Sequence, residues 1–172
     1  KSRYLEPVLT EAGATWVRPG PLSAAGVSEV LARAFNGATI PPELAETPHI
    51  QDPHRLARCS AEPDVVWCQH HSGIFRSTDG GSTWSEITDV APSTFGFAVA
   101  AHPTDPGTAW FVPATSDEVR IPVDGRVVVT RTRDGGRTFE AIGTGLPARD
   151  AYHLVYRHGL DVDASGQHLV LG

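Results

Sequence analysis

Acidic, imidazole and guanidinium side chains gather in three short polar segments of this 172-residue chain. The segments are His70-His71-Ser72, Asp117-Glu118-Val119-Arg120, and residues 149–153. Two carboxyl groups about 5 to 9.5 Å apart can cleave a glycosidic bond by acid–base or nucleophilic chemistry. Arginine suits an anionic group, and aromatic rings stack on sugars. The residue types therefore fit glycan binding or cleavage, provided that the fold brings the segments together.

Each candidate residue has a possible role in this chemistry and a simpler structural explanation. The candidate catalytic carboxylates are Glu118, Asp150 and Asp117. The candidate substrate-binding residues are His70, His71, Arg120, Tyr152, His153 and Phe95. Loop carboxylates are commonly just solvated, a carboxylate can cap a turn, and a tyrosine can belong to the core. Since adjacent residues in a strand point to opposite sides, only one of the two histidines is expected to face the other candidates.

A repeated eight-residue signature indicates the elements that position these segments. The two clear copies are STDGGSTW at 77–84 and TRDGGRTF at 132–139, and a degenerate copy, LTEAGATW, occupies 9–16. Each clear copy follows an apolar strand and precedes an aromatic-led one, which predicts a tight strand–turn–strand. The carboxylate can accept backbone hydrogen bonds, and the glycines supply the turn dihedrals. One carboxylate per copy is too few for a calcium loop, so the structural interpretation is favoured.

This S/T-x-D-x-G-x-x-W/F pattern resembles the Asp-box, or BNR repeat, of sialidase-like β-propellers. The resemblance implies structural roles for Ser77, Asp79, Gly81, Trp84, Thr132, Asp134, Gly136 and Phe139. Residues 52–152 are also similar to bacterial proteins called exo-alpha-sialidase or BNR-repeat glycosyl hydrolase, through QHHSGIFR at 69–76 and DAYH at 150–153. Residues 120–122 form an Arg-Ile-Pro element like that of sialidases. In sialidases this element precedes the first box, whereas here it falls between the two clear boxes. No complete sialidase catalytic set can therefore be assigned.

A second repeat, RCSAEPDVVW at 58–67 and AHPTDPGTAW at 101–110, interleaves with the first. Together they give four antiparallel strands per unit, which is a propeller blade. We expect an all-β fold of about three blades, as a fragment of a six- or seven-bladed propeller with one short helical insertion. The expected divisions are a blade end at 1–17, an insertion at 18–54 with a helix near 23–35, blades at 55–88 and 95–143, and half a blade at 152–172. The helix either covers an apolar patch or serves as a lid.

In the families that the signature resembles, the boxes lie on one face and ligands bind on the opposite face, around a central tunnel. The resemblance thus places all the candidate site residues on the face that lacks the boxes. Two functions remain open at this point. One is a carbohydrate-active glycoside hydrolase, and the other is a non-catalytic propeller that serves as a ligand- or protein-binding scaffold.

Composition narrows the choice of partners. The net charge of −6, without a basic stripe, argues against nucleic acid. No apolar run approaches the length of a membrane span. The expected partners are a glycan or other small molecule and the rest of the propeller. No cofactor and no metal site are predicted, because zinc-type Cys/His spacing is missing. Cys59 and Cys68 could form a cross-strand disulfide or remain as buried free thiols, which leaves the compartment open between cytoplasmic and secreted.

Overall fold

The computed structural model describes residues 52–172. The degenerate signature at 9–16, the blade end at 1–17 and the helix near 23–35 lie outside the described residues, as does the insertion up to residue 51. No helix in the part that is described has the length and apolar character needed to cross a membrane. The only helical element there is a single 3-10 turn, η2 (Val123–Gly125).

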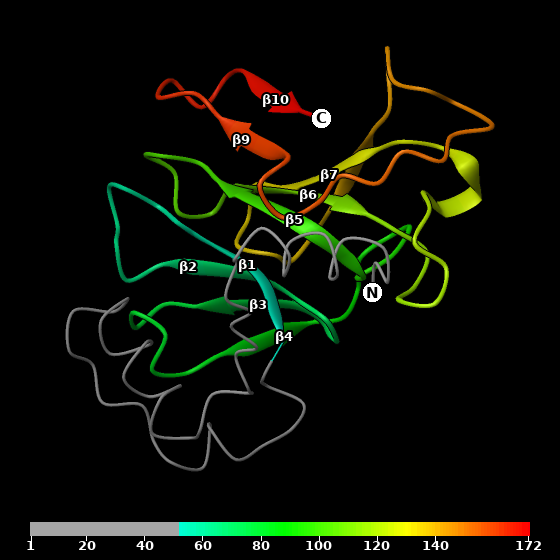
Figure 1. Ribbon diagram of the computed structural model, residues 1–172. Helices are drawn as coiled ribbons and strands as arrows, with labels where there is room; N and C mark the ends of the chain where they lie inside the picture. The colour runs from blue at the N-terminus through cyan, green and yellow to red at the C-terminus, as the bar shows by residue number, and fades with distance from the viewer. Residues whose placement is uncertain (1–51) are drawn as a thin grey trace, which may run out of the picture. The chain divides into compact units, whose positions relative to one another are not determined.

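Within residues 52–172, ten strands form three antiparallel sheets, which lie as successive layers in Figure 1. The first sheet contains β1 (Pro53–Arg58), β2 (Val66–His70), β3 (Gly73–Ser77) and β4 (Ser85–Ile87). The second contains β5 (Gly96–Ala101), β6 (Ala109–Pro113), β7 (Val129–Thr132) and β8 (Glu140–Ile142), and the third contains β9 (Leu160–Val162) and β10 (Leu169–Leu171). In both larger sheets each strand pairs with the next one in the chain. This meander is the arrangement of a propeller blade, and the predicted fold class is confirmed.

Apolar side chains fill the spaces between the layers. Between the first and second sheets, Trp67 of β2 and Phe111 of β6 are almost fully buried, and their ring centroids lie 6.1 Å apart. Trp110, the neighbour of Phe111, points to the other side of β6, into a second core that includes Leu160 of β9. Because the second sheet is covered on both faces, β5 and β6 are buried at every position. This explains why these strands are continuous apolar runs rather than alternating ones.

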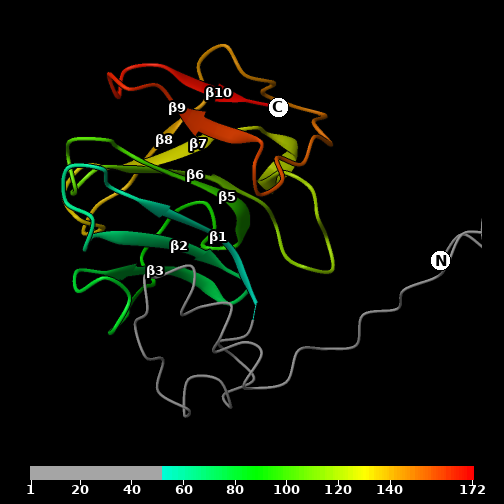
Figure 2. The ribbon, with the colours of Figure 1, turned by 60° about the vertical axis from the view of Figure 1, so that its left-hand side comes forward.

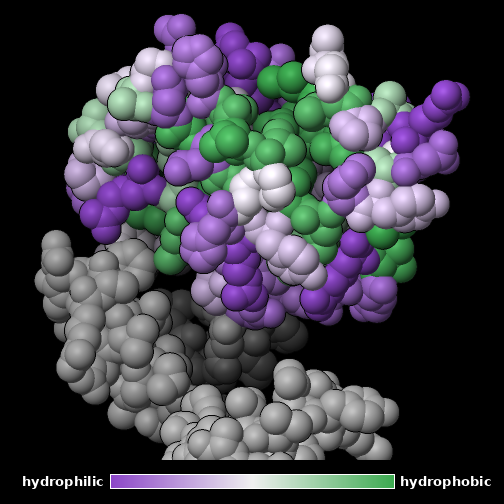
Figure 3. All heavy atoms as spheres, turned by 45° about the horizontal axis from the view of Figure 1, so that its top comes forward, coloured by the Kyte–Doolittle hydropathy of each residue, from purple (hydrophilic) through white to green (hydrophobic). Residues whose placement is uncertain are grey.

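The third sheet has only two strands and a partly apolar outer surface. Val170 of β10 is 67% exposed. Figure 3, seen from the side of β9 and β10, shows apolar residues in green towards the middle of this face, with polar residues in purple around them.

The connections fall at two opposite ends of the sheets, as Figure 2 shows. The β1–β2, β3–β4, β5–β6 and β7–β8 turns share one end, which we call the turn end. The β2–β3 turn and the β4–β5 and β6–β7 loops share the other, which we call the loop end. The two signature copies are thus at the turn end, and the polar segments at 70–72 and 117–120 are at the loop end.

Candidate functional site

The first signature turn is closed by two side chains that bond to the backbone and to each other. The Ser77 hydroxyl donates to Asp79 Oδ1 (2.7 Å) and accepts the Gly81 N–H (2.8 Å). The Asp79 carboxylate in turn accepts the backbone N–H and the hydroxyl of Thr83, at 2.8 and 2.6 Å. The bonds from Thr83 and then Ser77 lower the pKa of Asp79 to about 2. Its oxygens are therefore engaged in holding the turn.

The second signature turn has the same hydrogen bonds. Thr132 donates to Asp134 Oδ1 (3.0 Å) and accepts the Gly136 N–H (2.9 Å). Asp134 accepts the Thr138 N–H and hydroxyl at 2.9 and 2.6 Å, and these bonds hold the pKa of Asp134 well below its usual range. The ring of Phe139 then packs on the core, 6.1 Å from Phe111. Both turns therefore use their single carboxylate for hydrogen bonds within the turn.

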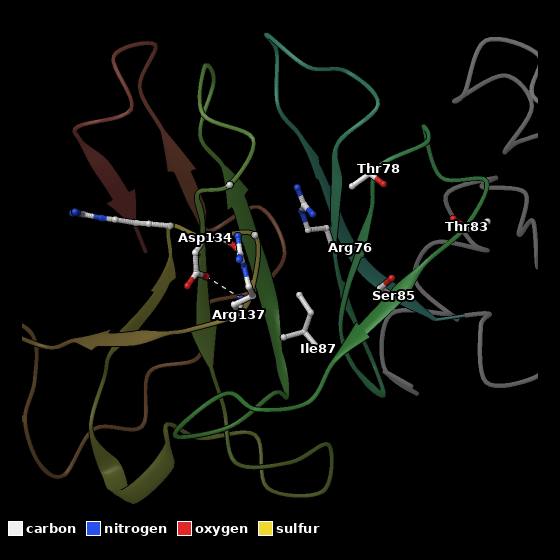
Figure 4. A pocket seen from close by; sticks show the side chains of 10 residues that line it. Arg76, Thr78, Thr83, Ser85, Ile87, Asp134 and Arg137 are labelled. Carbon is white, nitrogen blue, oxygen red and sulfur yellow. Dashed lines mark hydrogen bonds between the residues drawn. The ribbon is translucent and has the colours of Figure 1, made fainter.

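The turn end also carries an open cleft of about 580 Å³ between the first and second sheets. Figure 4 shows its lining, in which Arg76 faces the turn that carries Arg137. The Arg76 guanidinium lies 5.2 Å from the Trp67 ring centroid and contacts the Pro106 carbonyl at 3.5 Å. Arg137 donates through Nε to the Asp134 carbonyl (3.0 Å). Sequence reasoning missed this cleft, because its walls come from turns about 55 residues apart in the chain, beyond any local periodicity.

At the loop end, five rings from separate segments contact one another. His54 of β1 stacks on Phe97 of β5 (centroids 4.4 Å apart) and meets the edge of Phe95 (5.8 Å). His71 lies edge-on to Phe95 (6.0 Å), and Tyr156, which precedes β9, lies 5.0 Å from Phe97. Polar groups border these rings. We call the whole group the loop-end cluster, and its members are Asp52, His54, His71, Phe95, Phe97, Glu118, Arg120, Tyr156 and Arg157.

Asp52 is the centre of the charged part of the cluster. Its Oδ2 lies 3.6 Å from His71 Nδ1 and 3.9 Å from His54 Nε2, whereas its Oδ1 lies 3.9 Å from Arg157. The Asp52 side chain is 57% exposed and that of His71 is 44% exposed. Their polar atoms are thus open to a ligand from solvent.

Arg120 joins the charged and aromatic parts of the cluster. Its guanidinium lies over the Phe97 ring, 5.5 Å from the centroid, and forms an ion pair with Asp117. Hydrogen bonds to Tyr156 and Asp117 raise the pKa of Arg120 above its usual value. The cation is therefore fixed beside two rings, with part of its edge exposed.

Glu118 lies near the imidazole of His71. Bonds from its own backbone N–H and from the Ser116 hydroxyl, with a smaller contribution from His71, hold the pKa of Glu118 below its usual range. Glu118 is therefore ionised at neutral pH, which suits a base or nucleophile rather than a proton donor.

The structure brings together some of the predicted site residues. His71, Phe95, Glu118 and Arg120 belong to the loop-end cluster, and Asp117 joins it through Arg120. His70 points to the other side of the first sheet, where its ring meets the edge of Phe75 and its Nδ1 bonds to the Ser72 hydroxyl (2.8 Å).

The third polar segment is not joined to this cluster. Asp150 has a left-handed backbone (φ 52°) and lies beside Gly125 of η2. Tyr152 is 74% exposed, and within residues 52–172 no ring contact or ion pair links Tyr152 or His153 to the loop-end cluster. Roles for these three residues remain predictions.

Sequence reasoning missed five members of the cluster: Asp52, His54, Phe97, Tyr156 and Arg157. Two of these, Asp52 and His54, form an unexpected combination with His71, because each of the three presents a possible metal-ligand atom and these atoms all lie within 4.8 Å of one another. Zinc-type spacing does not reveal them, since it pairs nearby cysteines and histidines, whereas this group combines Asp52 and His54 at β1 with His71 of the β2–β3 turn.

The fold is shared with known proteins. No family model matches the chain, and none of the curated proteins is detectably similar to it in sequence. The GH74 xyloglucanase of Xanthomonas campestris superposes with a TM-score of 0.53 at 23% identity, over 70% of this chain and 18% of the enzyme. An ancestral GH74 enzyme gives 0.51 at 16% identity, over 66% of this chain and 14% of that one.

A third structure, YCF48 bound to D1 peptide, gives a TM-score of 0.40 at 20% identity, over 65% of this chain and 30% of that one. This chain thus spans less than a fifth of the length of the two GH74 enzymes. The neighbours are β-propellers, and this likeness establishes the fold alone. The chain therefore has a β-propeller fold, whereas its Asp-box and sialidase-like character rests on the sequence resemblance.

Proposed function

We propose that this propeller binds a carbohydrate at the loop-end cluster. The observation that carries the proposal is the exposed edge formed by Tyr156 and Arg120 beside Phe97. Tyr156 is 52% exposed, so one side of its ring is free to stack on a sugar. Arg120 and the carboxylates of Asp52 and Glu118 are placed to bond to sugar hydroxyls or to an acidic sugar group.

The turn end fits this role less well, although it holds an open cleft. The two signature carboxylates there are fully used inside their own turns. The cleft also lacks an aromatic platform, since none of the residues that line it is aromatic. A sugar ring therefore has a stacking partner at the loop end.

Isothermal titration of the full chain tests this proposal. The probes are sialyllactose, which carries a carboxylate, and a neutral xyloglucan oligosaccharide, chosen because a structural neighbour is a xyloglucanase. Arg120→Ala is expected to weaken binding about tenfold or more, because it removes charged hydrogen bonds. The matched control is Arg137→Ala, which removes an exposed arginine from the turn end and is expected to bind as wild type. Equal affinity for both variants, or loss only in Arg137→Ala, would contradict the proposal.

Glycoside hydrolysis is a second candidate, favoured by Glu118. This carboxylate is kept ionised, and both it and Asp52 interact with His71, so two carboxylates lie in one cluster. Asp117 is less suited, because its ion pair with Arg120 occupies it. Glu118→Gln, which keeps a side chain that can bond to sugar hydroxyls, is expected to stop release of reducing sugar from a glycan panel while sugar binding itself persists. Binding without any turnover by the wild type would instead support a non-catalytic propeller.

A further inference from the structure

We propose that Asp52, His54 and His71 bind one divalent transition-metal ion, for which Zn²⁺ is the best-suited occupant. The three side chains come from the start of β1, from β1 itself and from the β2–β3 turn, and their ligand atoms all lie within 4.8 Å of one another. Two imidazoles and one carboxylate form a donor set that favours zinc and its neighbours over calcium or magnesium. The inference is independent of sugar binding.

The hydrogen bond of His54 leaves the correct nitrogen available. His54 Nδ1 lies 2.6 Å from the carbonyl oxygen of Gly96, so Nδ1 must carry the proton and donate it. Nε2 is then the unprotonated nitrogen, and it is the atom that faces Asp52 at 3.9 Å. A bond from the second ring nitrogen to a backbone carbonyl is how metal-ligating histidines are usually oriented. The side chain is 2% exposed, which holds the ring in this orientation.

The spacing of the donors also fits. Bonds of about 2.0 to 2.1 Å to a tetrahedral zinc ion place neighbouring ligand atoms about 3.3 to 3.4 Å apart. Asp52 Oδ2 lies 3.6 Å from His71 Nδ1 and 3.9 Å from His54 Nε2, so small side-chain rotations close both gaps. Both of these contacts use the same carboxylate oxygen. The other oxygen faces Arg157, which neutralises part of the carboxylate without entering the group of donors.

The surroundings combine a buried wall with an open side. Phe95 and Phe97 pack against the two imidazoles and exclude water from one side. The Asp52 and His71 side chains are about half exposed, so an ion can enter from solvent. Three protein ligands leave a fourth position for water or for a ligand group, as in zinc sites that react or bind substrate.

Zinc titration of the chelator-treated full chain, followed by calorimetry, tests the proposal. The wild type is expected to bind one Zn²⁺, and Co²⁺ in its place should give the visible absorption of a tetrahedral site. His71→Ala and Asp52→Asn are each expected to weaken Zn²⁺ binding by about 10- to 100-fold or more. Both side chains are exposed, so the variants should fold, and tryptophan fluorescence during urea unfolding checks this.

The matched control is His168→Ala in the β9–β10 turn. His168 is an exposed histidine whose Nδ1 lies 3.1 Å from the carboxylate of Asp163, and its removal is expected to leave Zn²⁺ affinity unchanged. The proposal would be overturned if His71→Ala and Asp52→Asn both bound Zn²⁺ with wild-type stoichiometry and affinity. A loss of Zn²⁺ binding only in His168→Ala would overturn it as well. The titration contains no sugar, and sugar binding is measured with the chelator present, so either proposal can fail while the other stands.

Discussion

Replacing Thr132 by valine should destabilise the second sheet, although it removes only a hydroxyl. Thr132 is 1% exposed, and its oxygen accepts the Gly136 N–H at 2.9 Å and the Asp134 N–H at 3.4 Å. Valine has nearly the same shape but cannot accept, so the Gly136 N–H loses its partner. The Gly136 N–H is part-buried, so leaving it unpaired should cost about 1 to 2 kcal/mol, the lower part of the range for a buried polar group. With a urea m-value of about 2 kcal/mol/M, the midpoint should fall by about 0.5 to 1 M.

Thr130→Val is the matched control for this prediction. Thr130 lies on the same strand and is 0% exposed, but its hydroxyl makes only one contact, to the Phe111 carbonyl at 3.5 Å. That distance is at the limit of a hydrogen bond, so the same substitution should cost much less. Urea unfolding followed by fluorescence is a suitable assay, because Trp67 and Trp110 are buried in different cores. Equal midpoints for the two variants would refute the idea that the signature hydroxyl holds the turn.

Two further predictions concern titration and thiol chemistry. The pKa of Asp79 is about 2 in the folded chain and about 3.9 when unfolded, and that of Asp134 is lowered likewise. The stability that these two carboxylates contribute is therefore complete above about pH 5 and is lost as the pH falls towards 2. Between pH 6 and pH 2, the urea midpoint of an Asp79→Asn/Asp134→Asn variant should fall less steeply than that of the wild type. Parallel curves for the two proteins would count against this prediction. Both cysteines are free thiols, and burial raises the pKa of the Cys68 thiol to about 12. Ellman's reagent at pH 8 should therefore label Cys68 only after the chain unfolds. Rapid labelling of Cys68 in the folded chain would contradict this prediction.

The sequence carried enough information to predict the strands and turns. The signature residues act locally: Ser77 bonds to atoms two and four residues away, and Asp79 to an atom four residues away. Such short-range chemistry is visible in a motif, and β3 (Gly73–Ser77) is the strand expected before the first signature copy. The third sheet was harder to place, because β9 begins at Leu160, after a segment without regular structure.

The candidate site could be predicted only in part, because its contacts join distant segments. His54 bonds to Gly96, 42 residues later, and Tyr156 meets Phe97 across the space between two sheets. No local pattern marks either pair. Tyr156, which was not predicted, supplies one ring of the cluster. Like Tyr152, whose role stays a prediction, it lies in an irregular segment, where periodicity does not fix the direction of a side chain.

The central claim is that ligands bind at the loop end, whereas the two signature turns stabilise the fold. An NMR titration is the direct test of this claim. Backbone amide shifts of the isotope-labelled chain should be recorded while sialyllactose or the xyloglucan oligosaccharide is added. We expect shifts around His71, Arg120 and Tyr156, with residues 77–84 and 132–139 unchanged. Shifts confined to the two signature turns and the cleft between them would contradict it.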